Sequence, residues 1–258
     1  MRLLPTTTRP TATIAHRGAS GHAPENTLAA IRLAVEQRSD LVEVDVQRTR
    51  DGVLVLVHDT DLSRTTDAAR VLPDRAPWRV ADLTFDEVRR LDAGSWFAPA
   101  YAGEQVPTLE QTLDLLTTLG VGLQLEVKHP RLHPGIVGDV ARTLQSRRAG
   151  NVVVQSFDHE AMHDFARLAP ATPVGLLGHP PVRRLPALAS FACQVNPHHR
   201  RATATYVAAV HAAGLECLVW TVDRPADMER VLAAGVDGVI TNRPDVLEGV
   251  RDDGLVPA

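Results

Sequence analysis

The sequence is poor in cysteine and has no long apolar run. Its 258 residues include two cysteines, Cys193 and Cys217, and neither belongs to a CxxC or zinc-type spacing. A chain of this length buries a core large enough to fold without disulfides. No uninterrupted apolar stretch reaches the roughly 18 residues that a membrane-spanning helix needs. The composition therefore argues against a disulfide framework, a cysteine-ligated zinc site and stable membrane insertion.

An excess of positive charge is also absent. The chain has 27 Lys and Arg against 31 Asp and Glu, which gives a formal net charge of −4. Since nucleic acids bind strongly basic surfaces, we expect no nucleic-acid partner. The N-terminal stretch 1–15 is a poor signal peptide because Pro5, Arg9 and Pro10 interrupt any apolar segment. These features predict a cytoplasmic protein.

Short apolar runs alternate with amphipathic stretches along most of the chain, which is typical of repeated strand–helix units around a parallel sheet. The length fits one barrel of roughly 250 residues. Helices with one apolar stripe are predicted over 26–37, 108–119 and 225–234. The predicted strands are 12–16, 41–47, 53–58, 121–128, 151–157, 173–177, 193–196, 216–222 and 237–241.

Nine strands are one more than an eight-stranded barrel needs. Only a short Asp-Gly turn separates the second run from the third, so we predict that 53–58 is an extra strand after the second barrel strand. Residues 59–107 then form an insertion that contains one helix, over 84–91. No composition break marks a second domain. The sequence thus predicts an α/β protein with a single (β/α)₈ TIM barrel over residues 1–258 and a small insertion after the second strand.

Two predicted strands carry acidic side chains on the face that points into the barrel. Alternation along the second strand turns its valines toward the helices, and Glu43 and Asp45 toward the interior. The strand over 121–128 places Glu126 and Lys128 inward in the same way. Three carboxylates near the C-terminal strand ends suit Mg²⁺ or Ca²⁺. The alternative is that they only form interior salt bridges, with Arg17 and Lys128.

Two histidines follow predicted strands at what we expect to be the same end of neighbouring strands. A single histidine in such a place is more often a structural polar group. His16 and His58 together, beside the carboxylates, favour proton transfer: one imidazole takes a proton from the nucleophile and the other gives one to the leaving oxygen. Arg17 and Lys128 add positive charge that a phosphoryl group could use.

Further short motifs extend this set along residues 14–244. In chain order they are His16-Arg17-Gly18, Pro24-Glu25-Asn26-Thr27, Glu43-x-Asp45, Asp51-Gly52, His58-Asp59, Leu62-x-Arg64-Thr65, Gly94-Ser95-Trp96-Phe97, Pro107-Thr108-Leu109-Glu110, Glu126-Val127-Lys128, Gln155-Ser156-Phe157, Trp220-Thr221-Val222 and Gly235-Val236-Asp237-Gly238-Val239-Ile240-Thr241-Asn242. In this order and spacing, the chain resembles the glycerophosphodiester phosphodiesterase family.

The resemblance implies a (β/α)₈ barrel with a small insertion after the second strand. It also implies divalent-metal-dependent hydrolysis of a small glycerophosphodiester to sn-glycerol 3-phosphate and an alcohol. The implied roles are an acid–base pair of His16 and His58, metal ligands Glu43, Asp45 and Glu126, and phosphate contacts Arg17 and Lys128.

Several other residues leave two interpretations open. Trp220, at a strand end, forms either an aromatic wall for the glycerol or part of the core. Asn26 either approaches the site or caps the first helix. Trp96 and Phe97 either close over the substrate or anchor the insertion locally. The three histidines that follow later strands are either substrate contacts or parts of solvated loops: His179, His198 and His199. The two cysteines are interpreted as buried, inert thiols.

Two other functions remain as alternatives. A lysophospholipase D or phospholipase C-like enzyme would need an apolar route to the site, and the chain has no basic amphipathic helix for a membrane surface. A non-catalytic binding barrel is disfavoured because all five metal and acid–base positions are filled, although a fold alone does not prove activity.

Overall fold

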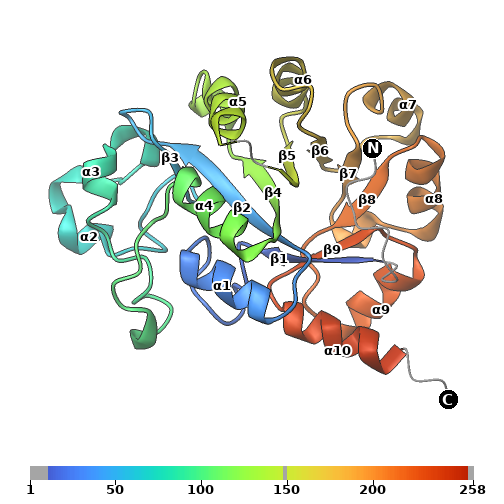
Figure 1. Cartoon of the computed structure of the whole chain (residues 1–258), viewed down its shortest axis with the longest axis horizontal. Coiled ribbons are helices and arrows are strands. Elements are labelled where there is room, and N and C mark those ends of the chain that lie inside the picture. Colours follow the sequence, from blue (N-terminus) through green and yellow to red (C-terminus); the bar gives the residue numbers. More distant parts are fainter. Residues whose placement is uncertain (1–10, 148–149, 255–258) are drawn as a thin grey trace.

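Eight parallel strands close into a barrel in the computed structural model of the protein, which describes residues 11–147 and 150–254 (Figure 1). Part of the N-terminal stretch assessed above as a signal peptide, residues 1–10, lies outside the described residues. Neighbouring strands follow the order β1-β9-β8-β7-β6-β5-β4-β2, and pairing of β1 with β2 completes the ring. The barrel strands are β1 (Ala12–His16), β2 (Leu41–Arg48), β4 (Gly122–Val127), β5 (Val152–Ser156), β6 (Val174–Leu177), β7 (Gln194–Asn196), β8 (Glu216–Val219) and β9 (Gly238–Thr241). The predicted TIM barrel is confirmed.

One further strand, β3 (Leu54–Leu56), lies outside the ring and pairs with β2 in antiparallel orientation. The turn before it is tight, and Gly52 adopts a φ of +93° that favours glycine. The extra strand predicted over 53–58 is therefore present, as the return arm of a hairpin that extends β2.

A helix follows every barrel strand, with the insertion lying between β3 and the second of these helices. Figure 1 shows the helices around the outside of the barrel. They are α1 (Leu28–Glu36), α4 (Leu109–Leu119), α5 (Ile136–Ser146), α6 (His159–Leu168), α7 (Leu185–Leu188), α8 (Ala204–Ala212), α9 (Pro225–Ala233) and α10 (Pro244–Gly254). Thr27 caps α1 by accepting a hydrogen bond from the backbone N–H of Ala30, so the interpretation of Asn26 as the cap is wrong.

The insertion, residues 59–107, contains α2 (Ala68–Val71), α3 (Phe85–Val88) and short 3₁₀ turns. It projects to the left of the barrel in Figure 1. Its apolar side chains form a cluster of their own, which includes Val55 and Val57 of the β3 segment and buries Leu62, Leu83 and Leu91. This cluster is distinct from the main barrel core, and the insertion docks on the barrel through the hairpin.

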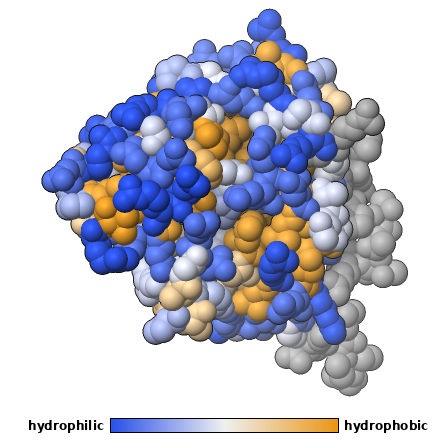
Figure 2. All heavy atoms as spheres, turned by 60° about the vertical axis from the view of Figure 1, so that its left-hand side comes forward, coloured by the Kyte–Doolittle hydropathy of each residue, from blue (hydrophilic) through white to orange (hydrophobic). Residues whose placement is uncertain are grey.

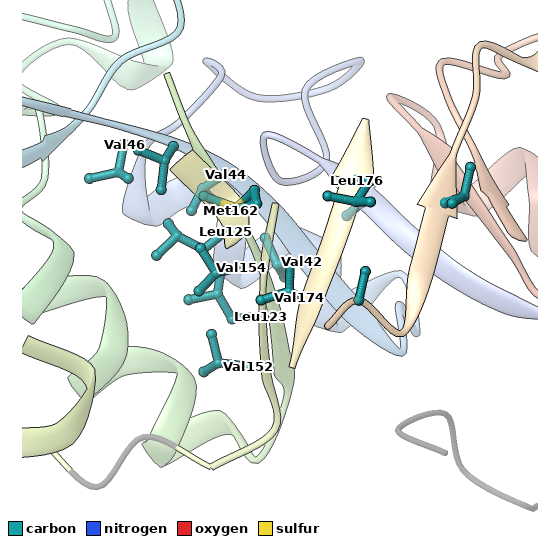
Figure 3. Packing of buried hydrophobic residues seen from close by; sticks show 14 of the residues in the cluster. Val42, Val44, Val46, Leu123, Leu125, Val152, Val154, Met162, Val174 and Leu176 are labelled. Atoms are coloured by element: carbon teal, nitrogen blue, oxygen red, sulfur yellow. The ribbon is translucent and has the colours of Figure 1, made fainter. Parts of the chain in front are cut away.

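The main core lies between the strands and the surrounding helices. Side chains at alternate positions of β2, β4 and β5 fill it, as the alternation predicts, and Figure 3 shows Val44, Leu125 and Val154 gathered on one side of their strands. A smaller apolar cluster fills part of the barrel interior with Ile14, Leu218 and three neighbours. Polar side chains on the same inward face lie toward the opposite end of the barrel, at the C-terminal ends of the strands, where active sites of this fold are built.

The two cysteines lie at the start of their strands, as predicted. Cys217 is fully buried, and Cys193 is partly exposed and donates its thiol hydrogen to the carbonyl of Val174. Burial raises the pKa of each thiol to about 12, so both stay protonated at neutral pH. This agrees with their interpretation as inert thiols.

On the face shown in Figure 2, apolar patches are separated by hydrophilic side chains. None of the helices in the described residues is both long enough and apolar enough to span a bilayer.

Candidate active site

The three predicted metal ligands meet inside the barrel. Glu43 and Asp45 lie on β2 and Glu126 lies on β4, directly opposite Asp45 in the strand register. One oxygen from each carboxylate lies within 4.8 Å of one oxygen from each of the other two. All three residues are buried. The convergence that side-chain alternation predicted is therefore present in the structure.

Two cations accompany these three carboxylates. The Arg17 Nε lies 3.2 Å from an oxygen of Asp45, and the Lys128 Nζ lies 2.7 Å from Glu126 and 3.6 Å from Asp45. The interior salt bridges of the alternative interpretation are thus formed. Two cations nevertheless leave one of three carboxylate charges unbalanced. Among the described residues Glu43 has no Lys or Arg side chain beside it, and it accepts only the backbone N–H of Arg17.

The electrostatics of the cluster reflect this shortage. Burial and the charges of Asp45 and Glu126 raise the pKa of Glu43 well above its usual range. Burial, together with Asp45, raises the pKa of Glu126 to about 7. Asp45 behaves in the opposite way, because Arg17 and Lys128 outweigh its burial and lower its pKa. A divalent cation such as Mg²⁺ or Ca²⁺ fits these three buried residues, because it prefers oxygen ligands and would balance their excess negative charge.

His16 ends β1 beside this cluster. Its Nδ1 lies 2.6 Å from the Oδ1 of Asn242, whose own amide group donates to Asp223 over 2.7 Å. Because Asp223 fixes the amide orientation, the Asn242 oxygen faces the ring and Nδ1 carries the hydrogen. The Nε2 atom then points toward Glu43, 4.0 Å away. Burial and the charge of Arg17 lower the pKa of His16 to about 4, which keeps the ring neutral.

His58 reaches the site by a different route from the one expected. The two histidines do not lie at the same end of neighbouring strands, because β3 runs antiparallel to β2. The hairpin instead returns the chain toward the barrel, where Val57 donates its N–H to the carbonyl of Asp45. The side chain of Gln47 then holds the following segment by donating to the carbonyls of Val57, His58 and Asp59.

Asp59 orients the ring of His58 through a 2.7 Å contact with its Nδ1. Burial alone would raise the pKa of Asp59, but hydrogen bonds from Arg64 and His58 lower it to about 2. Arg64 also donates to both oxygens of Glu25, which in turn binds Arg17 over 2.9 Å. A continuous chain of hydrogen bonds and ion pairs therefore connects His58, which directly precedes the insertion, with Arg17 in the barrel.

The site opens into a cavity of about 90 Å³. Of the predicted site residues, all except Asp45 line it: His16, Arg17, Glu43, His58, Glu126, Lys128 and Trp220. The remaining walls are Gln155, Phe157, Leu177, Thr221 and Ile240. The Trp220 ring is fixed by a hydrogen bond from Nε1 to the carbonyl of Asn196 and by edge contacts with the rings of Phe157 and His198.

Other residues with open interpretations lie outside the cavity wall. Trp96 contacts Phe97, Phe97 contacts Tyr101, and Trp96 donates to the carbonyl of Ala93, which supports the local anchoring interpretation. His179 stacks on Tyr206, and His199 pairs with Arg230. His198 packs with its ring nearly perpendicular to that of Trp220, and it does not line the cavity.

Asn26 donates to Asp45 and also accepts its backbone N–H, so of its two interpretations the approach to the site is the one present. Three further residues of the site had no role assigned from the sequence. Asn242 orients His16, Asp223 orients Asn242, and Arg64 pairs with Asp59 and Glu25. Asn242 and Asp223 follow strands β9 and β8, much as His16 ends β1, whereas Arg64 lies in the insertion. The φ of Arg17 (56°) and of Asn26 (57°) is positive, which is uncommon away from glycine and marks a constrained site.

The raised pKa values make a prediction about stability without metal. A carboxyl group whose pKa is higher in the folded than in the unfolded protein binds more protons when folded, so stability falls as pH rises between the two values. For Glu126 this window runs from 4.5 to about 7. We expect the melting temperature of chelator-treated protein to fall across this window, and added Mg²⁺ or Ca²⁺ to raise it more at pH 8 than at pH 6.

Thermal melts of Glu126→Gln measure the contribution of this one group. The variant should show a flatter pH profile than the parent protein, whereas Glu160→Gln, on a side chain that is 84% exposed, should keep the parent profile. Parallel profiles of the parent and Glu126→Gln would contradict the prediction.

Comparison with known proteins places this geometry in context. The model of the glycerophosphoryl diester phosphodiesterase family matches residues 16–246. A putative glycerophosphodiester phosphodiesterase of Bacillus subtilis is 38% identical, covering 91% of this chain and 95% of that protein. A glycerophosphodiester phosphodiesterase of Caldanaerobacter subterraneus is 36% identical, covering 92% and 96%. The fold is also similar to that of an Oleispira antarctica phosphodiesterase solved with the product sn-glycerol-3-phosphate, with a TM-score of 0.85, 30% identity and coverage of 93% and 96%.

Proposed function

Because this chain belongs to the glycerophosphoryl diester phosphodiesterase family, we propose that it hydrolyses glycerophosphodiesters to sn-glycerol 3-phosphate and an alcohol, using a divalent cation and two histidines. One observation carries the proposal: two cations, two histidines and two of three converging carboxylates line a single cavity at the C-terminal end of the barrel. Active sites of this fold are built at that end.

The charges of the site support a divalent cation and a monoanionic substrate. Three carboxylates outnumber the two cationic side chains beside them, and Arg17 is shared with Glu25, so the site has an excess of negative charge that a divalent ion would offset. With the ion in place, Arg17 and Lys128 would face a monoanionic phosphodiester. Glu43, Asp45 and Glu126 would hold the ion, which when bound supplies positive charge to the phosphate oxygens.

The two histidines suit the proton transfers of the reaction. In each ring Nδ1 is occupied, by Asn242 in His16 and by Asp59 in His58, so each presents Nε2 for proton exchange. One ring accepts the proton of the attacking oxygen and the other donates a proton to the departing oxygen. This assignment serves both direct attack by water and initial attack by a glycerol hydroxyl.

The walls of the cavity suit a small polyol. Trp220, Leu177 and Ile240 provide apolar contacts beside the charged groups. A hollow of about 590 Å³ shares Glu126, Lys128 and Phe157 with this cavity and gives the alcohol part of the diester room beyond it.

A substrate panel tests the proposal. Glycerophosphodiesters with choline, ethanolamine, glycerol and inositol head groups are assayed beside a lysophospholipid, with sn-glycerol 3-phosphate and the released alcohol both quantified. We expect turnover of at least one glycerophosphodiester and little turnover of the lysophospholipid. The reverse preference would indicate the lipid phosphodiesterase, and binding without turnover of any substrate would indicate a non-catalytic barrel.

Lys128 allows a more specific prediction, because it touches both Glu126 and Asp45 and also lines the cavity. Lys128→Met removes a positive charge that faces the phosphate, so kcat/KM should fall by about 10²-fold. Metal affinity should not fall, since the lysine competes with the ion for the same carboxylates. Steady-state kinetics and calorimetric metal titration measure the two effects separately. An unchanged kcat/KM together with tighter metal binding would limit Lys128 to charge balance.

A further inference from the structure

Four amide side chains form a hydrogen-bonded group in the barrel interior beneath the cavity. They are Gln124 of β4, Gln155 of β5, and Gln194 and Asn196 of β7, and all four are buried. The Gln124 Nε2 donates to the side-chain oxygens of Gln155 and Gln194, over 2.9 and 3.0 Å. The Asn196 Nδ2 donates to the same oxygen of Gln155 over 2.8 Å. Two donors thus share the Gln155 oxygen.

A carboxylate fixes the direction of these hydrogen bonds. The Gln194 Nε2 donates to Glu216 over 3.3 Å, and an ionised carboxylate only accepts hydrogen bonds. The Gln194 oxygen must therefore face Gln124, which has to present its NH₂ group. Since that NH₂ group also points at Gln155, the Gln155 oxygen faces the interior. Reversing the amide of Gln155 would place two NH₂ groups against each other.

The NH₂ group of Gln155 consequently faces the cavity. Gln155 lines the cavity wall and lies directly opposite Glu126 in the strand register. Within residues 11–147 and 150–254 its Nε2 has no hydrogen-bond partner. Its Nε2 atom also keeps some solvent exposure, whereas the unpaired side-chain oxygens of Gln124 and Asn196 are fully enclosed. The site therefore contains an oriented, neutral donor that the charged groups do not use.

The neighbouring strand keeps space for this arrangement. Gly175 of β6 pairs with Gln155, and a Cβ on Gly175 would lie 3.1 Å from the Asn196 Nδ2, 3.2 Å from the Gln194 oxygen and 3.3 Å from the Gln124 Nε2. A side chain there would crowd the amides that hold Gln155. Gly175 thus leaves the space that the amide group orienting Gln155 needs.

We propose that Gln155 binds substrate by donating a hydrogen bond from Nε2 to a hydroxyl of the glycerol. This rests on the proposed function, because it deepens the substrate recognition of that site. In the proposed function the phosphate faces Arg17, Lys128 and the ion that the carboxylates would hold, and such charged groups are its strong partners. A neutral, immobilised amide in a wall shared with Leu177 and Trp220 matches a neutral hydroxyl.

Binding of phosphate compounds to Gln155→Leu tests the assignment without requiring turnover. Calorimetry with protein saturated in Mg²⁺ compares sn-glycerol 3-phosphate, propane-1,3-diol phosphate, propane-1,2-diol 1-phosphate and inorganic phosphate. The variant should bind sn-glycerol 3-phosphate about tenfold more weakly, the effect of one hydrogen bond that leaves a buried hydroxyl unpaired. Inorganic phosphate, which has no glycerol, should bind parent and variant equally.

The two propanediol phosphates identify the hydroxyl. Each lacks one glycerol hydroxyl, so the one that lacks the partner of Gln155 should bind parent and variant with the same affinity, and the other should show the full loss. Equal weakening with all four compounds, inorganic phosphate included, would overturn the proposal and point to a phosphate contact or a structural role. An unchanged affinity of the variant for sn-glycerol 3-phosphate would also overturn it.

A matched control separates hydrogen bonding to the ligand from the general effect of removing a buried polar group. Thr112→Val removes a buried hydroxyl that donates to the Thr108 carbonyl on α4, outside both the amide group and the cavity wall, and it should leave all four affinities within about twofold. Failure of the proposed function would look different, because the parent protein would then bind these compounds without hydrolysing any glycerophosphodiester, or would not bind them.

Discussion

Replacement of His16 or His58 by Ala is expected to lower kcat by about 10²-fold or more while the protein stays folded, as loss of a general acid or base implies. Both rings line the cavity, and each has its Nδ1 held by a neighbour so that Nε2 is presented to substrate. Steady-state kinetics with a glycerophosphodiester, alongside thermal melts, measure the effect.

The comparison needs a histidine of similar position without the proposed role. His198→Ala provides it, since that ring packs nearly perpendicular to the ring of Trp220 but does not line the cavity. It should keep kcat within a few-fold of the parent. The His16, His58 double variant should lose less than the product of the single losses, because residues that act as a unit are not additive. Near-parental kcat in either single variant would assign that histidine a structural role.

Removal of divalent metal is expected to abolish turnover. A bound ion contributes several kcal/mol to transition-state stabilisation, which corresponds to about 10³-fold or more in rate. Chelation followed by addition of Mg²⁺ or Ca²⁺ should restore activity, and the ion that restores it at the lowest concentration is the better cofactor. Undiminished turnover after thorough chelation would exclude a metal-dependent reaction.

Glu43→Gln tests the same site through its own residue. Among the described residues, no Lys or Arg side-chain nitrogen lies within 4.0 Å of the Glu43 carboxylate, so a bound ion is its expected counter-charge. Glu43→Gln removes that negative charge, and metal affinity should fall. The parent protein should gain about 2.7 kcal/mol of stability at a metal concentration of 100 times Kd, and the variant should gain clearly less at the same concentration. Equal gains would place the ion elsewhere.

The parts of the site that follow from local alternation were predictable from the sequence. Inward placement of Glu43, Asp45 and Glu126 needs only the two-residue period of a strand and the assumption of a barrel. His58 was predicted to approach the site, but for the wrong geometric reason, since strand orientation is decided by pairing and not by the run of apolar residues. Asn26 was left undecided because a cap and a buried ligand of Asp45 look alike in sequence.

The orienting residues required the folded structure. Asn242 meets His16 across 226 positions of sequence, at the point where β1 and β9 pair. The amide direction of Gln155 depends on Glu216, three strands away, through two intervening side chains. No local pattern specifies such contacts, because each results from closure of the barrel and from competition among several polar groups for the same partners.

The proposed catalytic groups are divided between the barrel and the segment that includes the insertion, whose apolar side chains form a separate cluster. The barrel holds His16 and the carboxylates, whereas His58, Asp59 and Arg64 belong to the segment that packs in the smaller cluster. If this segment opens locally, His58 leaves the site while His16 and the carboxylates stay in place. Loss of activity in mild denaturant would then precede global unfolding. The ion pair between Arg64 and Glu25 is a contact that this local opening would break, while the barrel itself stays folded but inactive.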